Sequence, residues 1–585
     1  MKRFFILTIL PLIGIALIAQ SFVVDDDWQD KVEPALLNKI AETGSADFLV
    51  LFSENADLND AQGLDKDEKA LLVYDRLQAQ ATQSQANVID FLEAQEIPYQ
   101  TFFIINMIHA KGDADLLQSI AEMPEVHKIQ TNPVAKTERL QPAISGGART
   151  VTWGIEMINA DDVWALGYTG QGVIVGGQDT GYEWEHPALK EKYRGWDGTS
   201  ADHNYNWHDA VHEQNPLNDD DNNPCGFDSP FPCDDNNHGT HTMGTMVGAD
   251  GDMEIGVAPD SKWIACRNME RGWGMLTTYV ECFEWFLAPT DLNGENPDPT
   301  QAPHVIANSW SCPEVEGCNP DNFDIMETAV NNLKAAGTVV VVSAGNSGNQ
   351  GCSTVNTPAS IFENSYTVGA TNEADNIAGF SSRGPVTVDG SNRLKPNVSA
   401  PGTNVLSSIR NGEYASFNGT SMAGPHVAGA VALVISSNPA LAGDVETIED
   451  ILEQSAVSKT TDEDCGETDG EEIPNNTYGY GRIDALAAVE AALALISNTD
   501  ETDYSDAVKV APNPFNDAVH FSFLQNLGET TVEIYDVSGK ILRAEQQNIS
   551  GGENLILNLS GTASGVYFYH LRFEDGTLEG KILKQ

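Results

Sequence analysis

Residues 418–434, which read NGTSMAGPHVAGAVALV, constrain the fold more than any other part of the chain. Small and polar residues lead into a run of Ala, Val and Leu, which predicts a tight turn followed by a buried helix. Ser421 falls at the start of that helix, where the first backbone N–H groups lack internal partners and carry partial positive charge. A serine at this place is either a simple helix cap or a nucleophile whose developing oxyanion those N–H groups would stabilise.

Two motifs upstream favour the nucleophile. A serine nucleophile needs a general base, and the base needs a carboxylate that orients it. The segment GVIVGGQDTG is an apolar strand ending near Asp179, and NHGTHTMGT offers His238 at the start of another helix. The order Asp179, His238, Ser421 along the chain is the order found in subtilisin, and it differs from that of chymotrypsin and of the α/β-hydrolases.

The motifs DTG, HGTH and GTSMAGPHVAG together resemble the subtilisin-like serine proteases (subtilases), over about residues 153–493. The resemblance implies a triad of Asp179, His238 and Ser421 that works through an acyl-enzyme intermediate and requires no cofactor for catalysis. Asn346, in VVVVSAGNSG, matches the oxyanion-hole asparagine of the family. Asn also suits a tight turn, so a purely structural role is the alternative.

The resemblance also implies a substrate cleft lined by two backbone segments, which match Ser309, Trp310, Ser311 and Ser343, Ala344, Gly345. Such backbone would pair with an extended peptide as an added strand. Trp310 and Ser311 stand where relatives often have Leu and Gly, so the cleavage preference stays open, and Trp310 equally suits the core. His241 and His426 are interpreted as structural, because the first follows His238 by less than a helical turn and the second lies on the helix of Ser421.

The catalytic region is predicted to be an α/β fold, in which a parallel sheet carries helices on both faces. Apolar strand-like runs at residues 173–177, 262–266, 304–308 and 338–343 alternate with helical stretches, as expected for such a sheet. The triad residues then lie at carboxyl ends of strands or at helix starts, where open α/β sheets usually place their sites. RNMERGWG, ECFEWFLAPTDLNG and NSWSCPEVEGC resemble the bacillopeptidase F-like branch of the family.

Two segments precede the catalytic domain, which is predicted at residues 150–496. Residues 1–21 combine two basic residues, an apolar run and a small-residue cleavage site, which predicts a secretory signal peptide. Residues 30–140 form a predicted α+β unit, with strands at 48–52 and 101–110 and a helix at 66–95. This unit resembles the inhibitory propeptide of the family, although a binding module is the alternative.

Two segments follow the catalytic domain. Residues 497–507 are an acidic linker, and residues 508–585 show short alternating segments broken by Gly and Asn, which predict a small β-sandwich. VAPNPFND, VEIYDVSGKIL, SGVYFYHLRF and the final GKILKQ resemble the C-terminal sorting domain of the Bacteroidota type IX secretion system. A carbohydrate- or protein-binding module is the alternative.

The eight cysteines all lie between residues 225 and 465. An even number in an exported chain predicts disulfides, and zinc is the weaker alternative because no CxxC spacing occurs. Sequence alone leaves the pairing open. Short polar loops favour Cys225 with Cys233 and Cys312 with Cys318, and the set would be completed by Cys266 with Cys282 and Cys352 with Cys465.

The chain is strongly acidic, with 86 Asp and Glu against 31 Lys and Arg and a formal charge of −55. Nucleic acids and anionic membrane surfaces would repel it. The acidic runs at residues 219–221 and 234–235 could hold structural Ca²⁺, although most charge runs are only solvated. No segment after the signal peptide has the length and apolarity of a membrane span.

We therefore expect a serine endopeptidase made as a zymogen and secreted, or carried to the cell surface, through the periplasm of a Bacteroidota-like Gram-negative cell. Its expected partners are protein or peptide substrates, its own propeptide as an intramolecular inhibitor, and the secretion machinery through the C-terminal domain. The alternative is a catalytically silent surface adhesin or binding protein on a subtilase scaffold. Every catalytic position holds the residue that catalysis needs, which disfavours that alternative.

Overall fold

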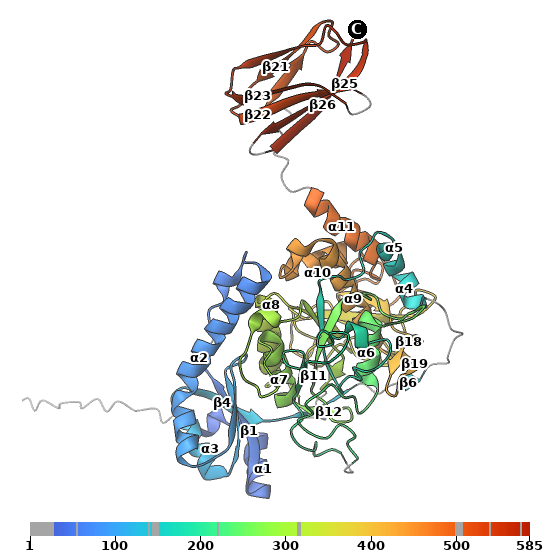
Figure 1. Cartoon of the computed structure of the whole chain (residues 1–585). Helices are drawn as coiled ribbons and strands as arrows, with labels where there is room; N and C mark the ends of the chain where they lie inside the picture. Colours follow the sequence, from blue (N-terminus) through green and yellow to red (C-terminus); the bar gives the residue numbers. More distant parts are fainter. Residues whose placement is uncertain are drawn as a thin grey trace, which may run out of the picture. The chain divides into compact units, whose positions relative to one another are not determined.

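A computed structural model of the 585-residue chain describes residues 28–53, 56–137, 141–142, 151–218, 222–312, 318–497, 507–536, 540–573 and 576–585. It divides into two compact units, Met1–Val489 and Glu490–Gln585 (Figure 1). The predicted signal peptide lies outside the described residues, as does the predicted linker except for its two end residues.

The first unit begins with a small α+β fold, shown in blue in Figure 1. Its four antiparallel strands have the order β2-β3-β1-β4. The elements are α1 (Pro34–Thr43), β1 (Ala46–Phe52), α2 (Lys66–Ala94), β2 (Tyr99–Phe102), β3 (Met107–Gly112), α3 (Ala114–Ala121) and β4 (Val126–Thr131).

The single strand expected at residues 101–110 is wrong, because that segment is the hairpin of β2 and β3. Asn106 adopts a left-handed φ of 47° and donates its backbone N–H to the carbonyl of Phe103. Asn tolerates that conformation better than most residues, and a turn follows.

A parallel sheet of seven strands forms the centre of the catalytic region, in the order β17-β16-β15-β13-β7-β11-β8. The strands are β7 (Ile174–Asp179), β8 (Trp207–Asp209), β11 (Lys262–Arg267), β13 (Val305–Asn308), β15 (Val339–Ser343), β16 (Tyr366–Thr371) and β17 (Val398–Pro401). The four strands expected from sequence are β7, β11, β13 and β15, which lie within two residues of their predicted bounds.

Helices cover both faces of this sheet, as predicted. The helices after residue 150 are α4 (Trp153–Met157), α5 (Ala160–Ala165), α6 (His238–Val247), α7 (Leu276–Leu287), α8 (Phe323–Ala335), α9 (Thr420–Ser437), α10 (Val445–Gln454) and α11 (Ala485–Ser497). Val340 and Val342 of β15 pack in one core with α7 and α8, whereas Val341 lies near Gly424 of α9. Because successive side chains of a strand point to opposite faces, α9 lies on the face opposite α7 and α8.

Four disulfides join all eight cysteines, in the pairs that the loop lengths favoured and in those that complete the set. The Cα atoms are 5.7 Å apart in Cys225–Cys233, 5.6 Å in Cys266–Cys282, 5.6 Å in Cys312–Cys318 and 5.3 Å in Cys352–Cys465. These separations are ordinary for disulfides. The zinc alternative is thereby excluded for these cysteines.

The second unit consists of two antiparallel sheets. One has the order β20-β21-β24 and the other β23-β22-β25-β26. The strands are β20 (Val508–Ala511), β21 (Ala518–Phe523), β22 (Gly528–Tyr535), β23 (Ile541–Ile549), β24 (Asn554–Asn558), β25 (Gly565–Phe573) and β26 (Gly576–Lys584). Phe521 of the first sheet and Val532 of the second belong to one buried core, which gives the predicted sandwich arrangement.

No helix among the described residues has the length and apolarity needed to cross a bilayer.

Candidate active site

Asp179 and His238 form a buried pair at the carboxyl edge of the sheet. Asp179 is the last residue of β7, and His238 is the first residue of α6. Both carboxylate oxygens of Asp179 lie 2.8 Å from Nδ1 of His238, and the backbone N–H of Thr180 donates to Asp179 Oδ1 at 2.7 Å. A carboxylate that accepts from Nδ1–H fixes the tautomer in which Nε2 carries the lone pair that can accept a proton.

Ser421 is the second residue of α9, and this helix packs against α6. Its side chain is buried, and no described residue forms a hydrogen bond with Ser421 Oγ. The base and the hydroxyl therefore sit at the N-terminal ends of two helices in contact. Catalytic hydrogen bonds are often absent or long before substrate binds, so an unbonded hydroxyl is compatible with a nucleophile.

Asn346 lies beside the start of α9. Its Oδ1 accepts hydrogen bonds from the backbone N–H of Thr420 at 2.9 Å and from the Thr420 hydroxyl at 3.1 Å. These bonds orient the amide and leave Nδ2 as the outward donor. A Cβ built on Gly419 would lie 3.6 Å from both Asn346 Nδ2 and the backbone N of Ser421. Two donors thus surround one small space, as an oxyanion site requires.

The two other histidines near the site hold backbone carbonyls, in agreement with their structural interpretation. His241 Nε2 lies 3.0 Å from the carbonyl of Val405, and His426 Nδ1 lies 2.8 Å from the carbonyl of Met422. Burial lowers the pKa of His241 to about 3 and the pKa of His426 to about 4. Both imidazoles are therefore neutral at physiological pH and donate to these carbonyls.

A segment of the chain itself lies in the expected peptide-binding position. β5 (Val134–Thr137) is the middle strand between β12 (Trp273–Met275) and β14 (Trp310–Ser311), antiparallel to both. β14 belongs to the first backbone segment expected from sequence, next to Ser309. β12 was not anticipated, because three residues around a glycine carry no strand signal of their own.

The second expected segment, Ser343, Ala344 and Gly345, has other backbone partners. The N–H of Ala344 donates to the carbonyl of Val368, and the N–H of Gly345 donates to the Thr420 hydroxyl. Among the described residues this segment forms no ladder with β5. Its contact with substrate therefore stays a prediction.

The side chain of Trp310 belongs to the core. Only 4% of its surface is exposed, and its ring centroid lies 4.2 Å from that of Tyr279. Its backbone pairs with Thr137 of β5. The core reading of Trp310 is thus confirmed, whereas contact of its backbone with substrate stays a prediction.

The acidic run at residues 234–235 holds protein groups. Asp234 accepts hydrogen bonds from the Thr180 and Thr240 hydroxyls at 2.9 and 2.6 Å. Asp235 forms a buried ion pair with Arg267 at 2.6 Å, and burial still raises the pKa of Asp235 to about 7. No cluster of three metal-ligating side chains occurs among the described residues, and residues 219–221 lie outside them.

Asp234 is a residue of the candidate site whose part in joining the segments of Asp179 and His238 was missed. It ties Thr180, which follows Asp179, to the first turn of α6, which begins at His238. Its carboxylate also accepts the backbone N–H groups of Asn236 and Asn237. An Asp that lies two residues before an Asn-Asn pair at a helix start is a local turn signal, and it could have revealed this role.

Two family models match parts of the chain. Residues 170–481 match a family model described as the subtilase family, and residues 509–585 match one described as a secretion system C-terminal sorting domain. The chain is 35% identical over 450 residues to Bacillopeptidase F of Bacillus subtilis, which covers 72% of this chain but only 29% of that protein. It is 31% identical over 295 residues to Subtilisin of Bacillus pumilus, covering 50% of this chain and 87% of that protein.

A solved structure shows the same fold at low sequence identity. The crystal structure of a mutant epidermin leader peptide processing serine protease from Staphylococcus aureus aligns with a TM-score of 0.54 and 17% identity. The alignment covers 77% of this chain and 99% of that protein.

Proposed function

Because the chain belongs to the subtilase family, we propose that it is a secreted serine endopeptidase made as a zymogen, with Asp179, His238 and Ser421 as its triad. The observation that carries the proposal is the buried Asp179–His238 pair, in which both carboxylate oxygens of Asp179 lie 2.8 Å from Nδ1 of His238. His238 begins α6, which packs against α9, the helix of Ser421. Acyl transfer requires a positioned base and a nucleophilic hydroxyl, and the starts of these two packed helices supply both groups.

In the proposed reaction, Ser421 Oγ attacks the carbonyl carbon of the scissile bond while His238 Nε2 takes the hydroxyl proton. Asp179 keeps the imidazole in the right tautomer and stabilises the imidazolium that forms. Asn346 Nδ2 and the N–H of Ser421 stabilise the oxyanion. His238 then protonates the leaving amine, which gives the acyl-enzyme. A water molecule next attacks the acyl carbon while His238 takes its proton, and His238 returns a proton to Ser421 Oγ as the acid product leaves.

The zymogen proposal is supported by the path of the predicted propeptide, residues 30–140, which we call the pro-part. β5 pairs with β12 and β14, and after three intervening residues β6 (Gln141–Pro142) pairs with β19 (Glu413–Asn418). β19 ends three residues before Ser421. A peptide that enters along β14 and leaves along β19 passes the nucleophile, so we place the self-processing cleavage between Thr137 and Gln141.

The pro-part also holds the catalytic region through contacts away from that path. Glu284 of α7 accepts the backbone N–H groups of Phe103 and Ile104 at 2.6 and 2.9 Å. At the start of α2, the Lys66 ammonium donates to the carbonyl of Ala302 at 2.8 Å. Such contacts would keep the pro-part bound as an inhibitor after cleavage.

A fluorophosphonate probe tests the proposed activity directly. The mature enzyme should be labelled at Ser421, whereas a silent adhesin or binding protein on the same scaffold should not react. Ser421→Ala should abolish labelling and leave the uncleaved precursor in a protease-free host. Normal maturation of that variant would exclude self-processing at Ser421.

The remaining expectations follow from the family and from the sorting domain. The reaction needs no organic cofactor, and calcium at residues 219–221 stays a prediction. Residues 509–585 match the sorting domain, which places the protein outside the cell or on its surface. We propose export through the periplasm by a type IX system, with proteins or peptides as substrates.

A further inference from the structure

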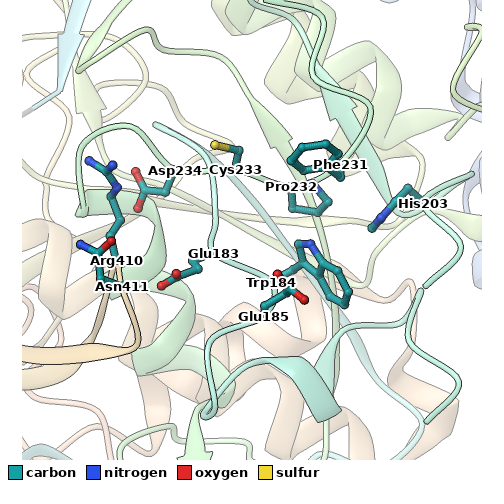
Figure 2. A pocket seen from close by; sticks show the side chains of 10 residues that line it. All are labelled: Glu183, Trp184, Glu185, His203, Phe231, Pro232, Cys233, Asp234, Arg410 and Asn411. Atoms are coloured by element: carbon teal, nitrogen blue, oxygen red, sulfur yellow. The ribbon is translucent and has the colours of Figure 1, made fainter. Parts of the chain in front are cut away.

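We propose that a cavity beside the triad binds a lysine or arginine side chain that follows the scissile bond of the substrate. The inference rests on the proposed endopeptidase activity and names a specificity site for it. The cavity has a volume of about 400 Å³ and is shown in Figure 2. Its lining includes Glu183, Trp184, Glu185, Phe231, Asp234 and Arg410.

The cavity is built from the three segments that carry the triad. Glu183 follows Asp179 by four residues, and Asp234 precedes His238 by four residues. Arg410 begins the turn between β18 (Val405–Ile409) and β19, the strand that leads to Ser421. The N–H of Gly412 in that turn donates to Glu183 Oε2 at 3.1 Å, which ties the turn to the segment after Asp179. The cavity is therefore fixed relative to the reacting groups.

The register of β6 places the cavity on the leaving-group side. Gln141 pairs with Asn418, and Pro142 pairs with Phe417. Successive residues after the cleavage region thus run antiparallel to β19, away from Ser421 and toward the turn at Arg410. In a substrate that follows this path, the residues that approach the cavity lie beyond the first positions after the scissile bond.

The side chains of the cavity suit a cation on an apolar stem. Figure 2 shows the carboxylates of Glu183 and Asp234 on the same side as Arg410, and the rings of Trp184 and Phe231 on the other. The Asp234 carboxylate already accepts hydrogen bonds from protein donors, so Glu183 and Glu185 are the lining groups that can attract a cation. With Arg410 as the one guanidinium, the lining is still net acidic. Carboxylates attract an ammonium or guanidinium, and the aliphatic stem of Lys or Arg packs against aromatic rings.

One detail of the contacts favours a cation over an anion. Glu185 is exposed, and no other described residue forms a hydrogen bond or ion pair with its carboxylate, so this group is available to a ligand. Lys190 Nζ, which lies outside the lining, is 5.3 Å from the ring centroid of Trp184 and 4.3 Å from that of Trp196. The outer side of these rings therefore already contacts one ammonium, and the two glutamates are the acceptors for a ligand.

Internally quenched peptides with one common acyl side test the proposal. Lys, norleucine or Glu is placed in turn at the third to sixth positions after the scissile bond. Each kcat/KM is divided by that of a peptidyl anilide, which has no residue after the bond. Wild type should prefer Lys over norleucine by about fivefold at one of these positions, the upper range for one partly exposed ion pair.

Glu185→Gln should reduce that preference to less than about twofold, because it removes one of the charges that attract the ligand. Glu471→Gln, the same change at another exposed glutamate, should keep it. Absence of a Lys preference, a preference for Glu, or an unchanged preference in Glu185→Gln would overturn the inference while anilide hydrolysis upholds the proposed function. Failure to hydrolyse the anilide would refute the proposed function, and the inference with it.

Discussion

Glu284 offers a direct measure of how tightly the pro-part holds the catalytic region. Its Oε2 accepts two hydrogen bonds, from the N–H of Phe103 at 2.6 Å and from the N–H of Ile104 at 2.9 Å. Both donors belong to the turn between β2 and β3. Glu284→Ala removes the acceptor and leaves two backbone N–H groups at the interface without a partner.

The binding free energy lost in Glu284→Ala follows from those two N–H groups. An unsatisfied buried N–H costs about 1–3 kcal/mol, and water entering the space left by the shorter side chain would recover part of it. A total of about 2–4 kcal/mol corresponds to an inhibition constant raised by about 30- to 1,000-fold. Because both N–H groups converge on one oxygen, the amide oxygen of Glu284→Gln can replace it, and that variant should lose less than about tenfold.

The assay uses the pro-part as a separate inhibitor of the mature enzyme. Residues 28–137 contain a hydrophobic core of their own, which includes Phe48, Val50 and Ile108, so they are expected to fold. Inhibition constants are measured against a peptidyl anilide for wild type, Glu284→Ala and Glu284→Gln. The reasoning fails if Glu284→Ala binds the pro-part as tightly as wild type, or if both variants lose the same affinity.

Three further predictions follow from the structure. Asn346→Ala should lower kcat by about 100- to 1,000-fold, a range known from subtilisin itself, with unchanged far-UV circular dichroism; wild-type kcat would remove Asn346 from the mechanism. Burial raises the pKa of Glu284 to about 8 from an ordinary 4.5, so binding of the pro-part takes up a proton, and inhibition should weaken as pH rises between these values. Glu284→Gln should lack this part of the pH dependence, and equal pH profiles of inhibition for wild type and Glu284→Gln would contradict this prediction. Deletion of residues 508–585 should leave kcat/KM unchanged and stop export in a type IX-competent host; normal export would refute the sorting role.

Local sequence signals were sufficient to place the proposed triad residues at one edge of the sheet and to predict most of its strands. Asp179, His238 and Ser421 each sit in a short motif at a strand end or a helix start, and parallel strands bring such ends to one edge. The run of four valines at residues 339–342 marks β15 because strands buried on both faces need no polar alternation. The disulfide Cys352–Cys465 closes a separation of 113 residues, and sequence offered it only as one way to complete the set after loop lengths had favoured two shorter pairs.

Contacts between distant segments could not be predicted in this way. Nothing in the sequence near Phe103 points to Glu284, which lies about 180 residues away, and the β2–β3 turn was read as part of one strand. The pairing of β5 with β12 and β14 likewise depends on segments separated by more than 130 residues. Such contacts are decided by tertiary packing, which no local period encodes.

The acidic residues of this chain fall into two kinds, exposed groups and groups that accept backbone N–H donors, and only the fold distinguishes them. A formal charge of −55 invites a reading of the carboxylates as solvated surface. Yet Asp179, Asp234 and Glu284 each accept backbone N–H groups at an element end or turn, where such groups lack partners within the helix or sheet. A carboxyl group removed from water is tolerated when several donors converge on it, so substitution by Ala should be more destabilising at these three positions than at the exposed acids around them.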